Sequence, residues 1–154
     1  MFTPKKTIGQ LVAEAKSRIE NDTTEDLRKE LDRGGVQLLD IRDIRERQKL
    51  GWIPGSMHVP RGMLEFWLDP TSPYHNGRVD PEKRIILYCA GGGRSVLATD
   101  VLRGMGFPDL ANYDEVWAAA GHAKTVFPTT FDELVRITGG TPHPVEPKQG
   151  PDVA

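Results

Sequence analysis

Residues 84–95 read RIILYCAGGGRS. The first five residues form a short, largely apolar run, which predicts a buried strand ending at Cys89. Three glycines follow, and Arg94 and Ser95 then open a helix. One side of that helix is marked by Val96, Leu97, Val101, Leu102 and Met105, and it closes at Gly104 or Gly106. A strand, a turn and a helix in this order indicate an α/β domain with a mainly parallel sheet.

The residues before this stretch extend the same pattern. The first 33 residues read as helical, with a capping box at Thr7 and Gln10 and a second helix that begins at Thr23 or Thr24. The run 36–42 predicts a largely buried strand, 43–50 a charged helix, and 57–60 a short edge strand. Residues 61–84 form a long connection with a helical turn or two at 63–68.

Residues 116–154 contain two short apolar patterns and a proline-rich segment. Two short helices are expected, one over 116–121 and one over 131–139, because glycines close each apolar pattern. Residues 141–154 contain four prolines and few apolar groups, which predicts a mobile tail. The expected organisation is a helical extension at 1–22, a single domain at 23–140 and the tail at 141–154.

Composition excludes several classes of function. The chain has 154 residues with a net charge of -2, which is unlike the cationic footprint of a nucleic-acid binder. No run approaches the roughly eighteen apolar residues that a membrane span needs. No secretory signal is visible, which predicts a cytoplasmic protein. The single cysteine excludes an internal disulfide, and the four histidines lack metal-ligand spacing, so no metal site is predicted.

Cys89 is the candidate nucleophile. It lies where a strand's carboxyl end meets a glycine-rich loop, and ligands of open α/β sheets bind at that edge. Loop N–H groups and the N-terminus of the following helix stabilise an anion there, and Arg94 adds a permanent charge. Such surroundings lower a thiol pKa from about 8.5 into a range of about 3.5–7.5. A lone cysteine is also common as a small buried apolar residue, and a glycine triplet is common in ordinary turns, so the pattern leaves both interpretations open.

Three segments together resemble a single-domain member of the rhodanese-like family. The family's first signature is similar to Asp40-Ile41-Arg42 followed by Glu46, Gly51, Ile53-Pro54-Gly55 and His58-Val59-Pro60. Residues 85–95 are similar to its active-site strand and loop. Residues 61–76 resemble a bacterial subgroup. The resemblance implies a five-stranded, mainly parallel sheet with helices on both faces. It also implies sulfur transfer from a donor, thiosulfate or a persulfide, to a thiophilic acceptor.

The resemblance also implies a role for each site residue. Cys89 would carry the sulfur as a persulfide, without a cofactor. Arg94 would bind an anionic donor or shape the loop, while Asp40 and Arg42 would be structural. The substrate cradle would comprise Ala90, Gly91, Gly92, Gly93 and Ser95. Apart from the resemblance, Arg61, Trp67, Tyr74 and His75 lie on the long connection, and two interpretations stay open: some of them line an acceptor site, or the connection is an ordinary packed surface loop. The expected partners are small-molecule donors and acceptors, or an acceptor protein, with no nucleic acid and no membrane.

Several residues differ from the usual pattern of the family, and two other functions remain as alternatives. Trp52 stands where the family usually has histidine, and 112–117 lacks the usual Gly-Gly. The loop has no lysine, and Arg94 is its only cation, which argues against thiosulfate as the physiological donor. The alternatives are a non-enzymatic partner-binding module and a phosphatase or arsenate reductase. Related phosphatases place the loop arginine one residue later, and the shorter loop of this chain argues against a phosphate site.

Overall fold

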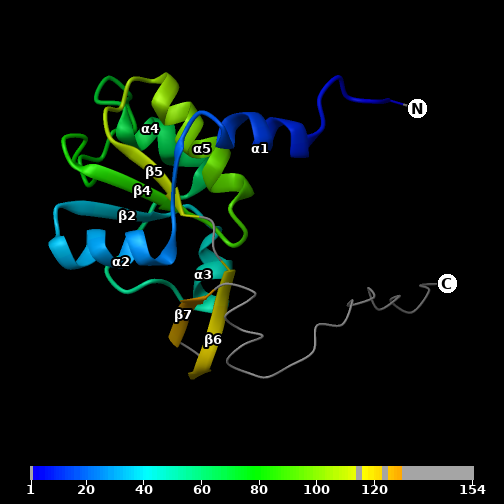
Figure 1. The fold of residues 1–154 in the computed structure, drawn as a ribbon. Coiled ribbons are helices and arrows are strands. Elements are labelled where there is room, and N and C mark those ends of the chain that lie inside the picture. Colours follow the sequence, from blue (N-terminus) through cyan, green and yellow to red (C-terminus); the bar gives the residue numbers. More distant parts are fainter. Residues whose placement is uncertain (1, 114–115, 123–124, 130–154) are drawn as a thin grey trace.

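A parallel five-stranded sheet forms the centre of the protein in a computed structural model, which describes residues 2–113, 116–122 and 125–129 (Figure 1). The strand order is β1-β5-β4-β2-β3, and every pairing in this sheet is parallel. The strands are β1 Glu20–Asp22, β2 Val36–Asp40, β3 Met57–His58, β4 Arg84–Tyr88 and β5 Leu110–Tyr113. The α/β class and the five-stranded parallel sheet expected from the sequence are confirmed.

Helices cover both faces of this sheet (Figure 1). They are α1 Ile8–Lys16, α2 Thr24–Arg33, α3 Ile44–Leu50, the 3₁₀ turn η1 Arg61–Met63, α4 Leu64–Leu68 and α5 Gly93–Gly104. Capping boxes begin α1, α2 and α3, so each of these helices starts where its sequence supplies the orphan N–H groups with acceptors. No helix in the described residues has the length and apolarity needed to cross a lipid bilayer.

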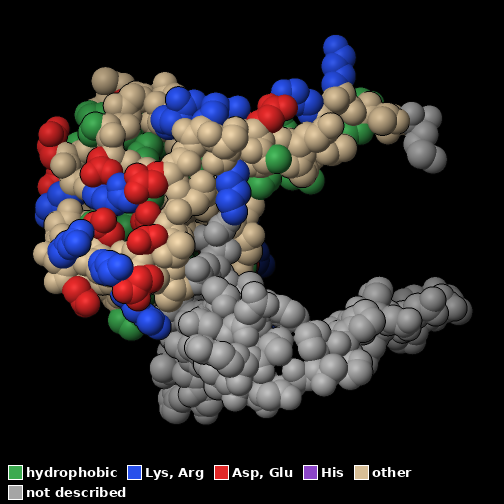
Figure 2. Space-filling view, viewed as in Figure 1, with side chains coloured by type: hydrophobic (Ala, Val, Ile, Leu, Met, Phe, Trp, Pro, Cys, Tyr) green, Lys and Arg blue, Asp and Glu red, His purple; other side chains and the backbone are tan. Residues whose placement is uncertain are grey.

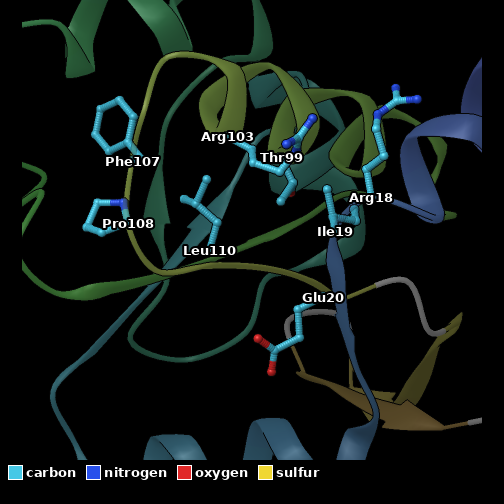
Figure 3. Close-up of a pocket in the computed structure, with 8 residues that line it drawn as sticks. All are labelled: Arg18, Ile19, Glu20, Thr99, Arg103, Phe107, Pro108 and Leu110. Atoms are coloured by element: carbon cyan, nitrogen blue, oxygen red, sulfur yellow. The ribbon is translucent and has the colours of Figure 1, made fainter.

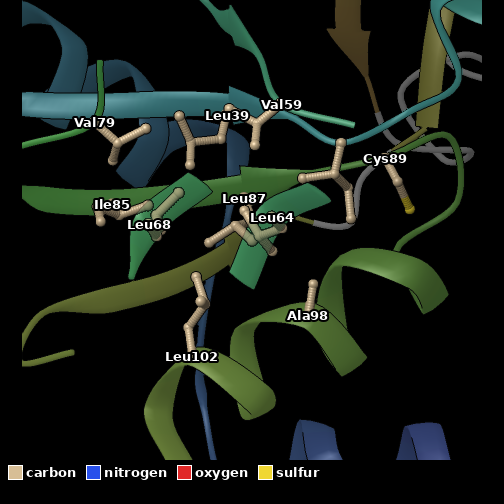
Figure 4. Close-up of a cluster of buried hydrophobic side chains, with 11 residues drawn as sticks. Leu39, Val59, Leu64, Leu68, Val79, Ile85, Leu87, Cys89, Ala98 and Leu102 are labelled. Atoms are coloured by element: carbon tan, nitrogen blue, oxygen red, sulfur yellow. The ribbon is translucent and has the colours of Figure 1, made fainter. Parts of the chain in front are cut away.

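Alternation along β4 divides the core into two clusters. Ile85 and Leu87 face α4 and α5, where they pack with Leu64 and Leu102 (Figure 4). Ile86 and Tyr88 face the other way and pack with Leu27 of α2 in the second cluster. A strand buried on both faces is continuously apolar, which is the pattern that β4 shows. Both layers therefore hold β4 rigidly and fix the position of the residue that follows it.

The expectation that the first 33 residues are helical is wrong at residues 20–22. Glu20–Asp22 form β1, a polar edge strand that pairs in parallel with β5. Three residues with no apolar alternation carry no strand signal of their own, and backbone pairing with β5 decides their conformation. Arg84 at the start of β4 bonds to both Glu20 and Asp22 and so fixes the side chains of this edge.

The helix expected at 116–121 is also wrong. Val116–His122 form β6, which pairs antiparallel with β7, Thr125–Thr129. Both segments contain β-branched and aromatic residues, and pairing between them overrides the helix propensity of the alanines at 118–120. The helix expected over 131–139 and the proline-rich tail at 141–154 lie outside the described residues.

Acidic and basic side chains are interspersed over the face shown in Figure 2. Arg84 illustrates the pattern, because its guanidinium lies within 4.0 Å of carboxylates from four acidic residues. These are Glu20, Asp22, Glu30 and Asp109. A charge network around Arg84, the first residue of β4, therefore stabilises the amino end of the sheet, opposite to the end where Cys89 lies.

Candidate active site

Cys89 follows β4 directly and is only 3% exposed. It belongs to the apolar cluster that also contains Ile41, Val59 and Leu64, and it lies at one end of that cluster (Figure 4). The neighbouring strand β2 ends in register with β4, since Asp40 pairs with Tyr88. The cysteine therefore lies at the carboxyl edge of the sheet, where the sequence predicted it.

The loop after Cys89 turns tightly into α5. Gly92 is the N-cap of this helix and has φ of 77°, a left-handed conformation that favours glycine. The Gly93 N–H donates to the Gly91 carbonyl at 2.9 Å, and the Val96 N–H donates to the Gly92 carbonyl at 2.8 Å. Of the three glycines, Gly92 is thus the one whose backbone conformation requires the absence of a side chain.

Ser95 connects the loop to the sulfur. Its hydroxyl is fully buried, donates to the Gly92 carbonyl at 2.9 Å and lies 3.5 Å from Cys89 Sγ. The sequence placed Ser95 in the substrate cradle, and the structure brings it within hydrogen-bonding distance of the cysteine.

The surroundings of Cys89 lower its pKa. Burial acts in the opposite direction and is the largest single influence, because it disfavours the thiolate. The Ser95 hydroxyl and backbone hydrogen bonds from Ser95, Gly91 and Arg94 outweigh it, and the pKa falls below the usual value of a thiol. The N-terminus of the twelve-residue α5 adds favourable dipole potential at the same point. The geometry thus favours a thiolate at the start of this loop.

The Arg94 side chain is bonded to Glu46, a residue that the sequence did not place in the site. Its Nη1 and Nη2 donate to Glu46 Oε2 and Oε1 at 2.6 and 2.8 Å, a bidentate pair between α5 and α3. The Arg94 bond lowers the pKa of Glu46, and Glu46 in turn raises the pKa of Arg94. Glu46 also accepts from the Asp43 N–H in the capping box of α3. It lies 48 positions before Arg94, and no spacing rule in a single sequence connects the two.

Asp40 and Arg42 form a buried ion pair beneath the loop. Arg42 Nε and Nη2 donate to the two oxygens of Asp40 at 2.8 and 2.7 Å, and Nη2 also reaches the Gly51 carbonyl at 2.7 Å. Both side chains are at most 4% exposed. His58 Nε2 is 2.8 Å from the Arg42 carbonyl, so the ion pair joins β2, β3 and the turn after α3.

Tyr88 completes this network from β4. Its hydroxyl donates to Asp40 Oδ2 at 2.9 Å, accepts from the Ile53 N–H at 3.2 Å and lies 3.0 Å from Ser56 Oγ. Burial and the neighbouring Asp40 carboxylate raise the pKa of Tyr88 to about 12, so its hydroxyl stays protonated. The residue immediately before the cysteine is therefore anchored on both its ring and its hydroxyl.

The connection after β3 is bonded mainly to itself. Arg61 Nη1 donates to Glu65 at 2.6 Å, and His75 Nδ1 is 2.9 Å from the Trp67 carbonyl. Tyr74 is 61% exposed and packs edge-on against Phe66. The Arg61 N–H donates to the Ile41 carbonyl, so the connection begins near the end of β2. The role of these residues in lining an acceptor site stays a prediction.

A pocket of about 170 Å³ lies away from the loop, beside α5, β1 and the segment before β5 (Figure 3). Two of its lining residues, Arg18 and Arg103, both bond to Asp100. Its lining includes none of residues 89–95. Within the described residues, no group of three or more His, Cys, Asp and Glu side chains is arranged to hold a metal ion.

Comparison with known proteins agrees with this fold. The family model of the rhodanese-like domain matches residues 23–121. The thiosulfate:glutathione sulfurtransferase of Homo sapiens is 30% identical over 94 residues, which cover 57% of this chain and 81% of the human protein.

Two solved structures are also similar. One is a protein of unknown function from Rhodopseudomonas palustris, described as a "possible tyrosine phosphatase". It is 42% identical with a TM-score of 0.69, covering 74% of this chain and 88% of that one. The other is the polysulfide-sulfur transferase homodimer of Wolinella succinogenes, 28% identical with a TM-score of 0.55. This match covers 68% of the present chain and 74% of the Wolinella succinogenes chain.

Proposed function

This chain belongs to the rhodanese-like domain family, and we propose that it is a sulfurtransferase in which Cys89 carries the transferred sulfur as a persulfide. Sulfurtransferases are among the proteins that it resembles. One observation carries the proposal. Cys89 begins a six-residue loop, its sulfur lies 3.5 Å from the Ser95 hydroxyl, and hydrogen bonds from residues 91–95 lower its pKa.

The first half of the proposed reaction loads the enzyme. The Cys89 thiolate attacks the outer sulfur of a donor such as thiosulfate, a sulfur–sulfur bond forms at Cys89, and the donor's own sulfur–sulfur bond breaks. Sulfite leaves with the electron pair of that bond, and the enzyme retains a persulfide anion. Backbone N–H groups at this loop, such as those of Gly91, Arg94 and Ser95, and the N-terminus of α5 would stabilise the outer sulfur, because it carries the negative charge.

The second half releases the sulfur. A thiophilic acceptor such as cyanide or a small thiol attacks the outer sulfur of the persulfide, and Cys89 departs as a thiolate. With cyanide, the products are thiocyanate and the original enzyme anion. A low pKa favours this step as well, because the departing group is the same thiolate. Arg61 and its neighbours on the connection are proposed to line the route of the acceptor, which is a small molecule or a protein.

A phosphatase is the second candidate, because the Rhodopseudomonas palustris protein carries that description. A phosphate site would need the loop arginine to face a tetrahedral anion. In this chain Arg94 is turned to Glu46 and held there by two hydrogen bonds. The loop from Cys89 to Arg94 also contains only six residues. Both observations favour sulfur transfer, and hydrolysis of p-nitrophenyl phosphate provides the direct comparison.

Intact-protein mass spectrometry tests the proposal. Brief exposure to thiosulfate or to a thiol persulfide should add about 32 Da, the mass of one sulfur atom, and cyanide should remove it. Cys89→Ser should show no such addition while keeping its unfolding temperature. Absence of the addition with both donors in the native protein would refute a Cys89 persulfide and favour a non-enzymatic binding module.

A further inference from the structure

The Arg94–Glu46 pair changes the charge that a donor meets at the loop. Residues 89–95 contain one charged side chain, Arg94. Its side chain is 43% exposed, so it lies at the surface of the loop rather than in the core. Glu46 occupies two of its N–H groups in the fork geometry that a sulfonate or carboxylate donor would otherwise use. An incoming anion therefore meets an ion pair with no net charge.

Other arginines at the same edge are also occupied. Arg42 is buried and bonded to Asp40, and Arg61 is bonded to Glu65 at the start of the connection. At residues 89–95, which the structure describes, the attraction that remains comes from backbone N–H groups and the helix N-terminus. A helix N-terminus is equivalent to a positive charge of about half a unit. This partial charge, with the N–H groups, suits a singly charged sulfur better than a dianion.

We propose that Glu46 is a specificity-determining residue, which directs the site towards singly charged sulfur donors and against dianions such as thiosulfate. This inference rests on the proposed function of Cys89. Glu46 acts through Arg94 and does not touch the reacting atoms, so it is a positioning residue. Removing its charge should make Arg94 available to a second negative charge on the donor.

Two donors of matched chemistry isolate this effect. Thiosulfate is a dianion, and methanethiosulfonate is a monoanion in which a methyl group replaces one charged oxygen. In each case Cys89 takes the outer sulfur, and the leaving group is sulfite or methanesulfinate, which keeps the electron pair. Each reaction conserves its charge. Because both donors meet the same thiolate, the ratio of their kcat/KM values cancels any change in the nucleophilicity of Cys89.

Glu46→Gln is the decisive variant. Glutamine can still accept from the Asp43 N–H, so the capping box of α3 is retained and the fold should be preserved. We expect the kcat/KM ratio of methanethiosulfonate to thiosulfate to fall about tenfold, chiefly through a lower KM for thiosulfate. Glu46→Asp keeps the charge and should keep the native ratio within about twofold.

Asp100→Asn is the matched control. Asp100 lies on the same helix as Arg94 and forms its own two-bond pair with Arg18, at 3.0 and 2.5 Å. The control therefore removes the same charge and a comparable two-bond pair, together with the Arg103 contact, six residues beyond Arg94 on α5. It should leave the donor ratio unchanged.

Each result decides a separate point. An equal loss with both donors in Glu46→Gln would overturn the inference, since Glu46 would then only shape the loop. An equal fall of the ratio in Asp100→Asn would also overturn it, because the effect would follow net charge. A native protein that forms no Cys89 persulfide from either donor would instead refute the proposed function itself.

Discussion

Replacing Ser95 with alanine should raise the pKa of Cys89. The Ser95 hydroxyl lies 2.9 Å from the Gly92 carbonyl and 3.5 Å from Cys89 Sγ, but it has one proton to donate. While Cys89 is a thiol, the carbonyl is the better acceptor. When Cys89 ionises, the sulfur becomes a charged acceptor and competes for that proton. The hydroxyl thus stabilises the thiolate more than the thiol.

The size of this effect follows from the difference between the two bonds. A hydrogen bond to a charged group contributes about 1.5–3 kcal/mol, and a bond between neutral groups about 0.5–1.5 kcal/mol. The difference is about 1–1.5 kcal/mol, because one bond is exchanged for the other. Since about 1.4 kcal/mol corresponds to one pKa unit, Ser95→Ala should move the Cys89 pKa upward by about one unit.

Alkylation by iodoacetamide as a function of pH measures this shift. Cys89 is the only cysteine in the chain, so every modification reports on it. Below both pKa values the variant should react about tenfold more slowly, and at high pH the two rates should converge. Thr99→Val is the control, since it removes another fully buried α5 hydroxyl, which donates to the Ser95 carbonyl at 2.9 Å. It should change stability without moving the inflection.

An unchanged or lowered inflection in Ser95→Ala would refute this reasoning. The thiolate would then depend on the backbone N–H groups and the helix N-terminus alone. An upward shift of equal size in Thr99→Val would refute it as well, because the cause would be a general loosening of α5.

Two further substitutions test the support of the loop. Tyr88→Phe removes a buried hydroxyl that donates to Asp40, and it should lower the free energy of unfolding by about 2–3 kcal/mol, as measured by urea denaturation. Gly92→Ala forces a side chain into a φ of 77° and should cost about 1–2 kcal/mol while slowing persulfide formation, whereas Gly91→Ala, with open space at its Cβ and no positive φ, should change neither.

The fold could be predicted where a pattern is local and strong. The run at 85–88 is apolar after Arg84, and three glycines follow Cys89 and Ala90, so β4 and the start of α5 follow from the residues themselves. Glu20–Asp22 gave no such pattern, because an edge strand of three polar residues is stabilised by its neighbour. Residues 116–122 contain an alanine run that favours a helix, and their pairing with 125–129 prevailed.

In the candidate site, too, contacts between residues close in sequence could be predicted, whereas contacts between distant residues could not. Cys89 and Ser95 lie six positions apart across one turn, so the sequence places them together. Glu46 and Arg94 meet only because α3 and α5 reach the same sheet edge, and one sequence holds no trace of that contact. Tyr88 was assigned to the strand as an apolar residue, although its hydroxyl bonds to Asp40 from 48 positions away. Contacts across the sheet depend on topology, and local patterns cannot encode them.

The separation of these contacts has a chemical consequence. Stabilisation of the sulfur comes from groups within residues 91–95, which move with the loop and lower the Cys89 pKa whatever donor is present. The charge presented to the donor depends on α3, through one carboxylate. A substitution of Glu46 in α3 should therefore change the relative use of the two donors more than it changes the nucleophile, whereas a substitution of Ser95 acts on the nucleophile alone. Ser95→Ala should accordingly slow both donors in equal proportion, and a change of their ratio in that variant would show that the two functions share residues.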